Sequence, residues 1–276
     1  MSFVCVPKRT LAVSVTGESC SLQCNHCRAR YLRHMVPVSS AQRVLASGEY
    51  TSILLSGGSD SRGRIPLAGS LSFIAWVKQR GIRINAHVGF QDPEDIVLLA
   101  PMFDKVSLDY IWDDETIREV YRMERTGEEY RQAAQFWLAE MLAGDPTGGV
   151  DGAKRRLNLH LTIGLKGGVV TGEREAIDSL IPVAPASLVF LILIPTEGTP
   201  YEHVPLVPLD DIESVIAYAR HRLPATDLVL GCMRPRVKGY GEELTRIAHR
   251  YDFRCIVGER GERTIEELEE CCVFYH

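Results

Sequence analysis

Three cysteines stand close together near the start of the chain, in the segment Cys20-Ser-Leu-Gln-Cys24-Asn-His-Cys27. Thiolate sulfur is a ligand for soft metal ions and for iron–sulfur clusters. Three thiolates in one loop can bind one face of a [4Fe–4S] cluster and leave the fourth iron without a protein ligand. Such an open iron can bind a substrate, as the open position of a catalytic metal does. We therefore predict that Cys20, Cys24 and Cys27 hold a [4Fe–4S] cluster.

A structural zinc site is the alternative for the same loop. Structural zinc takes four ligands, so this alternative needs His26 or His34 as the fourth. A Cys-x3-Cys-x2-Cys loop is not a usual spacing for zinc, and we favour the cluster for that reason.

Five cysteines remain outside this loop: Cys5, Cys232, Cys255, Cys271 and Cys272. They could ligate a second, auxiliary iron–sulfur cluster. Cys232 is the first candidate because it follows the predicted strand 228–230, and Cys5 and Cys255 are further candidates. Adjacent Cys271 and Cys272 cannot easily both reach one small cluster. The alternative is that these cysteines are small buried hydrophobic side chains, as free cysteines often are.

The composition is that of a globular protein. The chain has 276 residues, of which 45% are hydrophobic and 24% charged, and its formal net charge is −5. The longest apolar stretch, 188–195, is far shorter than the ~20 residues of a membrane span, and residues 1–5 lack the features of a signal peptide. We therefore expect a cytoplasmic protein with neither nucleic acid nor membrane as a partner. Thiols stay reduced there, so the cysteines favour metal chemistry over disulfides.

Short β-rich runs alternate with amphipathic stretches along the chain. Seven runs are predicted as strands: 11–15, 52–55, 82–88, 106–110, 157–163, 188–194 and 228–230. The amphipathic stretches predicted as helices are 71–79, 126–142, 210–222 and 242–251. Most of the strands are apolar on both faces, which is typical of a parallel sheet covered by helices. Residues 144–152, which are rich in glycine, are predicted as a surface loop.

This order predicts an α/β fold: a parallel (β/α) partial TIM-type barrel of about six βα units with a C-terminal extension. A flat, doubly wound sheet is the alternative. The alternation of strand and helix fades after Cys232. We therefore expect residues 1–232 to form the barrel core and residues 233–276 to form an extension packed on the barrel.

The cysteine loop resembles that of the radical S-adenosylmethionine (SAM) superfamily, which is Cys-x3-Cys-x-(aromatic)-Cys after the first strand of a partial barrel. His26 fills the aromatic position. The segment Ser56-Gly57-Gly58-Ser59-Asp60 resembles the Gly-Gly-Glu motif of that superfamily, although Ser59 stands where glutamate is common. The resemblance implies that His26, Ser56, Gly57 and Gly58 contact SAM. It also implies that SAM is cleaved to methionine and a 5′-deoxyadenosyl radical, which abstracts hydrogen from the substrate.

Further ligands are expected at the carboxyl ends of the later strands, where barrel enzymes keep their sites. The candidates there are His87, Asp109, Lys166 and Glu197, of which His87 and Asp109 are expected to contact SAM. His160 alternates with leucines, and we interpret it as a core or helix-facing histidine. No catalytic side chain is assigned.

The segment Pro195-Thr-Glu-Gly-Thr-Pro200 resembles the Pro-x-x-Gly-Thr-Pro turn of biotin-synthase-like radical SAM enzymes. More particular stretches between Val13 and Arg236, which include Gly231-Cys-Met-Arg-Pro-Arg236, look like the two-component lipoyl synthases. This resemblance implies sulfur insertion into an octanoyl chain on a lysine of a lipoyl-carrier protein. It also implies a second, related radical SAM subunit and an electron donor such as ferredoxin or flavodoxin.

Two other functions remain open at this point. One is another biotin-synthase-like radical SAM reaction with a single cluster, such as methyl transfer, ring closure or a mutase step. The other is not an enzyme: an iron–sulfur electron carrier or a zinc-stabilised adaptor.

Overall fold

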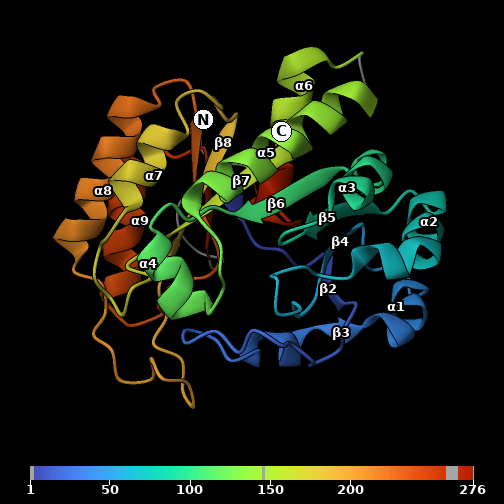
Figure 1. Cartoon of the computed structure of the whole chain (residues 1–276), viewed down its shortest axis with the longest axis horizontal. Helices are drawn as coiled ribbons and strands as arrows, with labels where there is room; N and C mark the ends of the chain where they lie inside the picture. Colours follow the sequence, from blue (N-terminus) through green and yellow to red (C-terminus); the bar gives the residue numbers. More distant parts are fainter. Residues whose placement is uncertain (1–2, 145–146, 259–266, 276) are drawn as a thin grey trace.

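One parallel sheet runs through the described part of this computed structural model, residues 3–144, 147–258 and 267–275 (Figure 1). Its strands are β1 (Phe3–Cys5), β2 (Thr10–Ser14), β3 (Val36–Pro37), β4 (Ser52–Ser56), β5 (Arg83–His87), β6 (Lys105–Asp109), β7 (Leu157–Ile163), β8 (Ser187–Ile192), β9 (Asp227–Leu230), β10 (Cys255–Val257) and β11 (Glu267–Leu268). Within the described residues the order of these eleven strands is β11-β1-β10-β9-β8-β7-β6-β5-β4-β2-β3. Every pairing between them is parallel.

Helices connect these strands and cover the outer face of the sheet. They are α1 (Val38–Leu45), α2 (Leu71–Gln79), α3 (Pro93–Leu99), α4 (Asp114–Thr116), α5 (Gly127–Gly144), α6 (Gly149–Arg156), α7 (Glu173–Ser179), α8 (Leu209–Arg222) and α9 (Tyr240–Arg250). Figure 1 shows α1–α3 on one side of the curled sheet and α7–α9 on the other.

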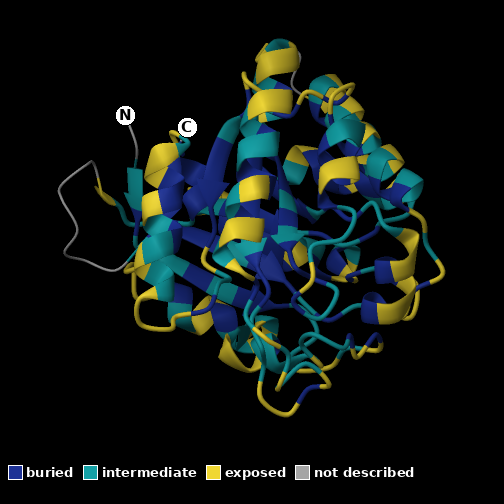
Figure 2. Cartoon of the chain, turned by 90° about the vertical axis from the view of Figure 1, so that its left-hand side faces the viewer, coloured by how far each residue is buried: buried dark blue, intermediate teal, exposed yellow. Residues whose placement is uncertain are grey.

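The burial pattern distinguishes the two faces of the sheet (Figure 2). In β7, Leu159, Leu161 and Ile163 are buried, whereas the alternate residues His160 and Thr162 are partly exposed. Successive side chains of a strand point to opposite faces. The leucines therefore pack under the helices, and the polar side chains point into the open interior of the curled sheet.

The ends of the sheet lie close together. The strand β1 pairs with β10 near one edge, β2 pairs with β4 near the other, and only residues 6–9 connect β1 to β2. So short a connection forces the sheet to curl back on itself. The architecture is therefore a curled, half-barrel parallel sheet, consistent with a partial TIM-type barrel, and not a flat, doubly wound sheet.

The seven predicted strands are all present, with ends that differ by at most two residues. The sequence did not reveal β1, β3, β10 and β11, which have only two or three residues each. The predicted helix 242–251 is present as α9, and β10, which follows it, continues the sheet. The division into a barrel core, 1–232, and an extension, 233–276, stays a prediction. A two- or three-residue strand is too short to display an alternating pattern.

The predicted surface loop 144–152 is also wrong over part of its length. From Gly149 onward the chain forms α6, which leads directly into β7. The guanidinium of Arg156, at the end of α6, donates hydrogen bonds to the carbonyl oxygens of Ala100 and Phe103, at 2.6 and 2.8 Å. Residues 145 and 146 lie outside the described residues.

A C-terminal strap, residues 269–275, lies across the amino ends of the strands. Thr51, just before β4, donates a hydrogen bond of 2.7 Å to the Glu270 carboxylate. Arg83, the first residue of β5, forms an ion pair with the same carboxylate. Because the Glu270 side chain is only 11% exposed, these partners compensate for the loss of its hydration. The strap closes the end of the half-barrel opposite the carboxyl ends of the strands.

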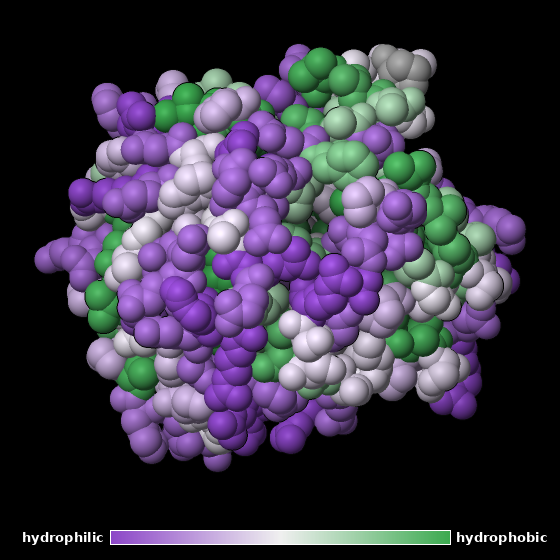
Figure 3. Space-filling view, viewed as in Figure 1, coloured by the Kyte–Doolittle hydropathy of each residue, from purple (hydrophilic) through white to green (hydrophobic). Residues whose placement is uncertain are grey.

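None of the helices among the described residues is long and apolar enough to cross a bilayer. Figure 3 shows hydrophilic residues over the centre of one face and hydrophobic residues toward the side where Figure 1 places α2 and α3. Val97 and Leu98 of α3 are among the exposed hydrophobic side chains.

We predict that Glu270→Gln lowers the free energy of unfolding by about 1–3 kcal/mol, because charge-assisted hydrogen bonds of a poorly hydrated carboxylate are lost. The matched control is Glu269→Gln, since the Glu269 side chain is 44% exposed and lies 3.9 Å from Lys8. The control should change stability by less than about 0.5 kcal/mol. Urea unfolding measures both variants, and equal losses would show that Glu270 does not hold the strap.

Candidate active site at the carboxyl ends of the strands

The cysteine loop, residues 15–29, leaves the carboxyl end of β2. Cys24 is buried, whereas Cys20 and Cys27 are partly exposed. The backbone N–H of Cys27 donates to the carbonyl of Cys24 at 3.2 Å, and this turn brings the two side chains to the same side. Gln23, Arg28 and Ala29 have left-handed backbone conformations, with φ of 48°, 41° and 60°. Three such residues in seven positions indicate a loop shaped for a ligand rather than for local stability.

The thiols of Cys24 and Cys27 interact with each other. This interaction, together with the neighbouring His26, lowers the pKa of Cys27 to about 4. The same interaction and burial raise the pKa of Cys24, whose thiol also donates to the carbonyl oxygen of Tyr121 at 3.8 Å. Thiolate is the form that binds metal, so the loop presents a ready ligand at neutral pH.

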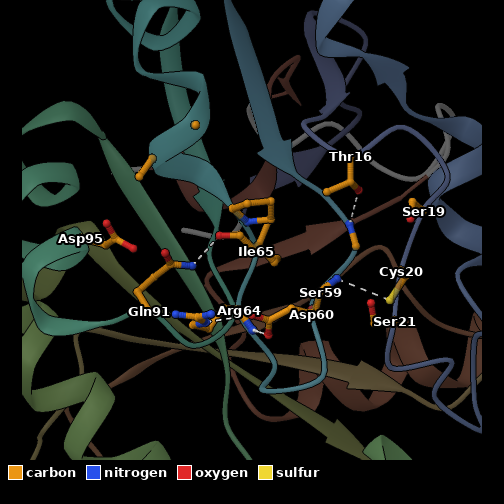
Figure 4. A pocket seen from close by; sticks show the side chains of 14 residues that line it. Thr16, Ser19, Cys20, Ser21, Ser59, Asp60, Arg64, Ile65, Gln91 and Asp95 are labelled. Atoms are coloured by element: carbon orange, nitrogen blue, oxygen red, sulfur yellow. Dashed lines mark hydrogen bonds and ion pairs between the residues drawn. The ribbon is translucent and has the colours of Figure 1, made fainter.

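The turn after β4 lies directly against this loop. A Cβ on Gly58 would lie 1.9 Å from the carbonyl oxygen of Ser19 and 2.6 Å from the Cβ of Cys20, so no other residue fits there. The N–H of Ser59 donates to the Cys20 sulfur at 3.4 Å, and the N–H of Ser21 donates to the Ser59 carbonyl at 2.7 Å (Figure 4). The backbone of Gly58 therefore lies in close contact with the cysteine loop itself.

A cavity of about 390 Å³ opens beside the Gly58 turn (Figure 4). Gly58 is among its lining residues. In Figure 4, Cys20 and Ser59 lie on one side, and Gln91 and Asp95 lie on the other. The cavity gives a small molecule access to the Cys20 sulfur.

His26 packs into the interior as an aromatic ring. Its ring centroid lies 5.1 Å from that of Tyr121, and its Nδ1 is buried without a hydrogen-bond partner among the described residues. Tyr121 belongs to a π-helical turn, Ile117–Tyr121, whose carbonyl at Val120 accepts a 2.8 Å hydrogen bond from the N–H of Asn25. This turn therefore contacts the cysteine loop at both Asn25 and His26.

Two histidines and an aspartate meet inside the half-barrel. His87 Nε2 lies 3.2 Å from Asp109 Oδ1, and the rings of His87 and His160 stack with centroids 5.4 Å apart. One possible ligand atom from each residue lies within 4.8 Å of the others. The interpretation of His160 as a core or helix-facing residue is therefore wrong. Its register partner in β6 is Asp109, so both side chains point to the same face.

The charges of this triad are coupled. Burial would raise the pKa of Asp109, but the charge of His87 and the hydrogen bond from it outweigh burial and lower the pKa to about 2. Burial also opposes protonation of His87, yet the Asp109 carboxylate raises the His87 pKa. For His160, burial and the neighbouring His87 lower the pKa to about 4. At neutral pH the triad thus carries an ionised aspartate and a neutral His160.

A polar layer lies one step below the triad, toward the strap. Ser107 donates a 3.0 Å hydrogen bond to the side-chain oxygen of Asn85, and Ser187 donates one of 2.8 Å to that of Asn158. The Asn85 amide also reaches the sulfur of Cys271 in the strap, at 3.6 Å. A closed TIM barrel fills its centre with apolar branched residues. This interior is polar instead, which suits a ligand site.

Four of the remaining cysteines lie together beside the strap: Cys5 of β1, Cys255 of β10 and Cys272 are buried in one apolar cluster, and Cys271 packs against it. Cys232 is exposed and follows the carboxyl end of β9. Cys5 hydrogen-bonds with Cys255 and lies within electrostatic range of Cys271 and Cys232. Among the described residues, no three of these five sulfurs lie within 4.8 Å of one another. No sequence feature favoured Cys271, whose contact with Asn85 depends on the path of the strap.

Two of the candidate ligands on later strands lie away from the interior. Lys166 Nζ pairs with Glu115 and, at 3.6 Å, with Glu119. Glu197 is exposed in the loop after β8. The loop after β8 nonetheless contacts the residues that follow the cysteine loop, because the Tyr31 hydroxyl lies 2.9 Å from the hydroxyl oxygen of Thr196.

Comparison with known proteins gives a shared fold and no close relative. No protein-family model matches the chain, and no curated protein matches it. The chain superposes on HydG, a maturase of the [FeFe]-hydrogenase, with a TM-score of 0.62 at 15% identity, over 93% of this chain and 57% of HydG. Methylornithine synthase (PylB) gives 0.60 at 14%, over 98% and 76%. SuiB of Streptococcus suis, solved with S-adenosylmethionine, gives 0.50 at 12%, over 94% and 51%.

We predict that Gly58→Ala distorts the cysteine loop and lowers the free energy of unfolding by about 1–3 kcal/mol, as overpacking does. Gly69→Ala is the matched control, because a Cβ on Gly69 meets no atom within 4 Å. Thermal unfolding of both variants tests this, together with the rate at which a thiol reagent labels Cys20. Equal stability and labelling in wild type and Gly58→Ala would contradict the packing argument.

Proposed function

We propose that the chain is a radical SAM enzyme whose Cys20, Cys24 and Cys27 hold a [4Fe–4S] cluster. The observation that carries this proposal is the position of these three cysteines, on one loop held against the Gly58 turn at the mouth of a polar half-barrel. HydG, PylB and SuiB, which share the fold, are radical SAM enzymes. The resemblance of the cysteine loop to that superfamily supports the same assignment.

The donor set fits such a cluster. The loop offers three sulfurs, one of them already favoured as thiolate, and the other five cysteines of the chain lie elsewhere. A bound cluster supplies the electron that cleaves SAM and so makes a radical able to attack an unactivated carbon. The protein's own part is to bind and orient SAM and to exclude water. We assign the SAM contacts to His26, Ser56, Gly57 and Gly58, with His87 and Asp109 further inside.

We further propose that the reaction is sulfur insertion of the lipoyl synthase type. The support is the set of five cysteines outside the loop, of which four lie beside the strap and Cys232 lies within electrostatic range of Cys5; they offer ligands for an auxiliary cluster that would donate sulfur. Cys232, Cys5 and Cys255 are the proposed ligands, and the contacts of Cys271 add it to this set. The substrate would be an octanoyl-lysine of a lipoyl-carrier protein, with a second radical SAM subunit and ferredoxin or flavodoxin as partners. SuiB has been solved with a precursor peptide, which fits a protein-borne substrate on this fold.

A single-cluster radical SAM reaction is the second candidate. It is favoured by the surroundings of Cys5, Cys255 and Cys272, which are buried in one apolar cluster, as free cysteines that act as small hydrophobic side chains often are. Methyl transfer, ring closure or a mutase step would each need only the first cluster. The zinc alternative has its own observation, because Cys24, His26 and Cys27 each offer an atom within 4.8 Å of the others.

Replacing one cysteine of the loop should abolish SAM cleavage. We predict that Cys24→Ala forms no 5′-deoxyadenosine with SAM and a reductant, because the cluster loses a thiolate ligand. Cys232→Ala is the control and should cleave SAM at a rate near that of wild type. Anaerobic metal analysis completes the test: a zinc site would give one zinc and no iron per chain. Undiminished 5′-deoxyadenosine from Cys24→Ala would overturn the assignment.

Removing an auxiliary ligand should uncouple SAM cleavage from sulfur transfer. We predict that Cys232→Ala and Cys271→Ala still form 5′-deoxyadenosine yet give at most about a tenth of the wild-type thiolated product. The assay contains an octanoyl-lysine peptide, reductant, SAM and the partner subunit. Normal sulfur transfer by both variants, or about four irons per wild-type chain after full reconstitution, would favour the single-cluster reaction instead.

A further inference from the structure

We infer that His87, Asp109 and His160 form a binding site for one divalent transition-metal ion, distinct from the cysteine loop. This inference uses none of the proposed cluster ligands and does not depend on the sulfur-insertion proposal. It assigns His87 and Asp109 to the ion instead of to direct contact with SAM.

The backbone brings the three residues together. They stand near the carboxyl ends of three adjacent parallel strands, β5, β6 and β7. Asp109 and His160 are register partners, and His87 is the register partner of Ser107, two residues before Asp109. Side chains two apart in a strand share a face. All three therefore point into the interior from neighbouring positions.

The distances suit a metal ion with little rearrangement. His87 Nε2 and Asp109 Oδ1 are already 3.2 Å apart, and an atom of His160 lies within 4.8 Å of both. Ligands about 2.1 Å from a common metal lie roughly 3 Å from one another. Small side-chain rotations would close the remaining gap. Cys24, His26 and Cys27 form a separate group of possible ligands.

The donor types select the kind of ion. Two imidazoles and one carboxylate suit Fe²⁺, Co²⁺ or Zn²⁺, whereas Mg²⁺ and Ca²⁺ prefer oxygen alone. Three ligands from one face leave positions open for a water or a substrate group. All three side chains are partly exposed to the open interior, so such a group could reach them.

His160 has an unused nitrogen. Its Nε2 is buried and has no hydrogen-bond partner among the described residues. A buried polar atom without a partner has lost its hydration without compensation, and proteins rarely keep one without a reason. A metal ion would give the His160 ring the partner it lacks.

The strands that carry the ligands are fixed to one another around the site. Ser107 bonds to Asn85 below the triad, and the Ser56 hydroxyl donates a 3.2 Å hydrogen bond to the carbonyl of His87 itself. Asn158, two residues before His160, accepts from Ser187. Outer hydrogen bonds of this kind hold metal ligands in place and raise affinity.

The test is a Co²⁺ titration of the full chain, loaded anaerobically with its cluster and desalted. We expect wild type to bind one Co²⁺ per chain more than His160→Leu, measured by elemental analysis after rapid gel filtration. Asp109→Asn should weaken this binding at least about tenfold, since even outer-shell changes weaken metal sites by that factor. The matched control is His249→Leu, at an exposed histidine of α9, which should bind Co²⁺ as wild type does.

Three outcomes would overturn the site. Equal Co²⁺ binding by wild type, His160→Leu and a second variant, His87→Leu, would place the ion elsewhere. Loss of the extra Co²⁺ in Cys24→Ala alone would place it at the cysteine loop. Weaker SAM binding by Asp109→Asn without any change in Co²⁺ would make the triad a SAM contact. Formation of 5′-deoxyadenosine is measured separately, so a failed metal site leaves the proposed function standing.

Discussion

The contact between the Gly58 turn and the cysteine loop constrains everything else at the mouth of the half-barrel. The strands β2 and β4 are neighbours, with Ser14 in register with Ser56, so their loops leave the sheet side by side. At that spacing a single methyl group on Gly58 would overlap the backbone of Ser19. The N–H of Ser59 then reaches a sulfur rather than another carbonyl. The loop is thus shaped by its neighbour, and its left-handed residues are held in place by packing from outside.

The polar lining of the half-barrel leaves its interior open to ligands. A half-barrel that filled its centre with branched apolar side chains would be stable but closed to ligands. Here the strap closes the amino end through Glu270, and hydrogen-bonded asparagines and serines form the layer above it. The apolar residues of the same strands, such as Leu159 and Leu161, face the helices instead. Stability therefore comes mainly from the outer layer, and the inner face is left for polar chemistry.

The sequence alone predicted the parts of this arrangement that are local. The runs that form β4 to β9 have four to seven residues each, and they contain enough apolar side chains to be recognised as strands in the sequence. The strands β1 and β10 have three residues each, and they pair across about 250 positions, with Phe3 opposite Cys255. No local sequence pattern predicts a contact between residues so far apart in the chain. The cysteine loop was visible for the opposite reason, because all its ligands lie within eight residues.

His160 illustrates what a sequence cannot show. A histidine between two leucines in a strand points to the face opposite the leucines. Whether that face meets the helices or the interior depends on the register with β6. Once Asp109 is its register partner, His160 belongs to a group of nitrogen and oxygen donors, while the sulfur donors lie at the mouth and near the strap. Sulfur selects soft ions, and imidazole with carboxylate selects borderline ones. Ligand type would thus keep an iron–sulfur cluster and a single divalent ion apart within one interior, although the same chain folds around both.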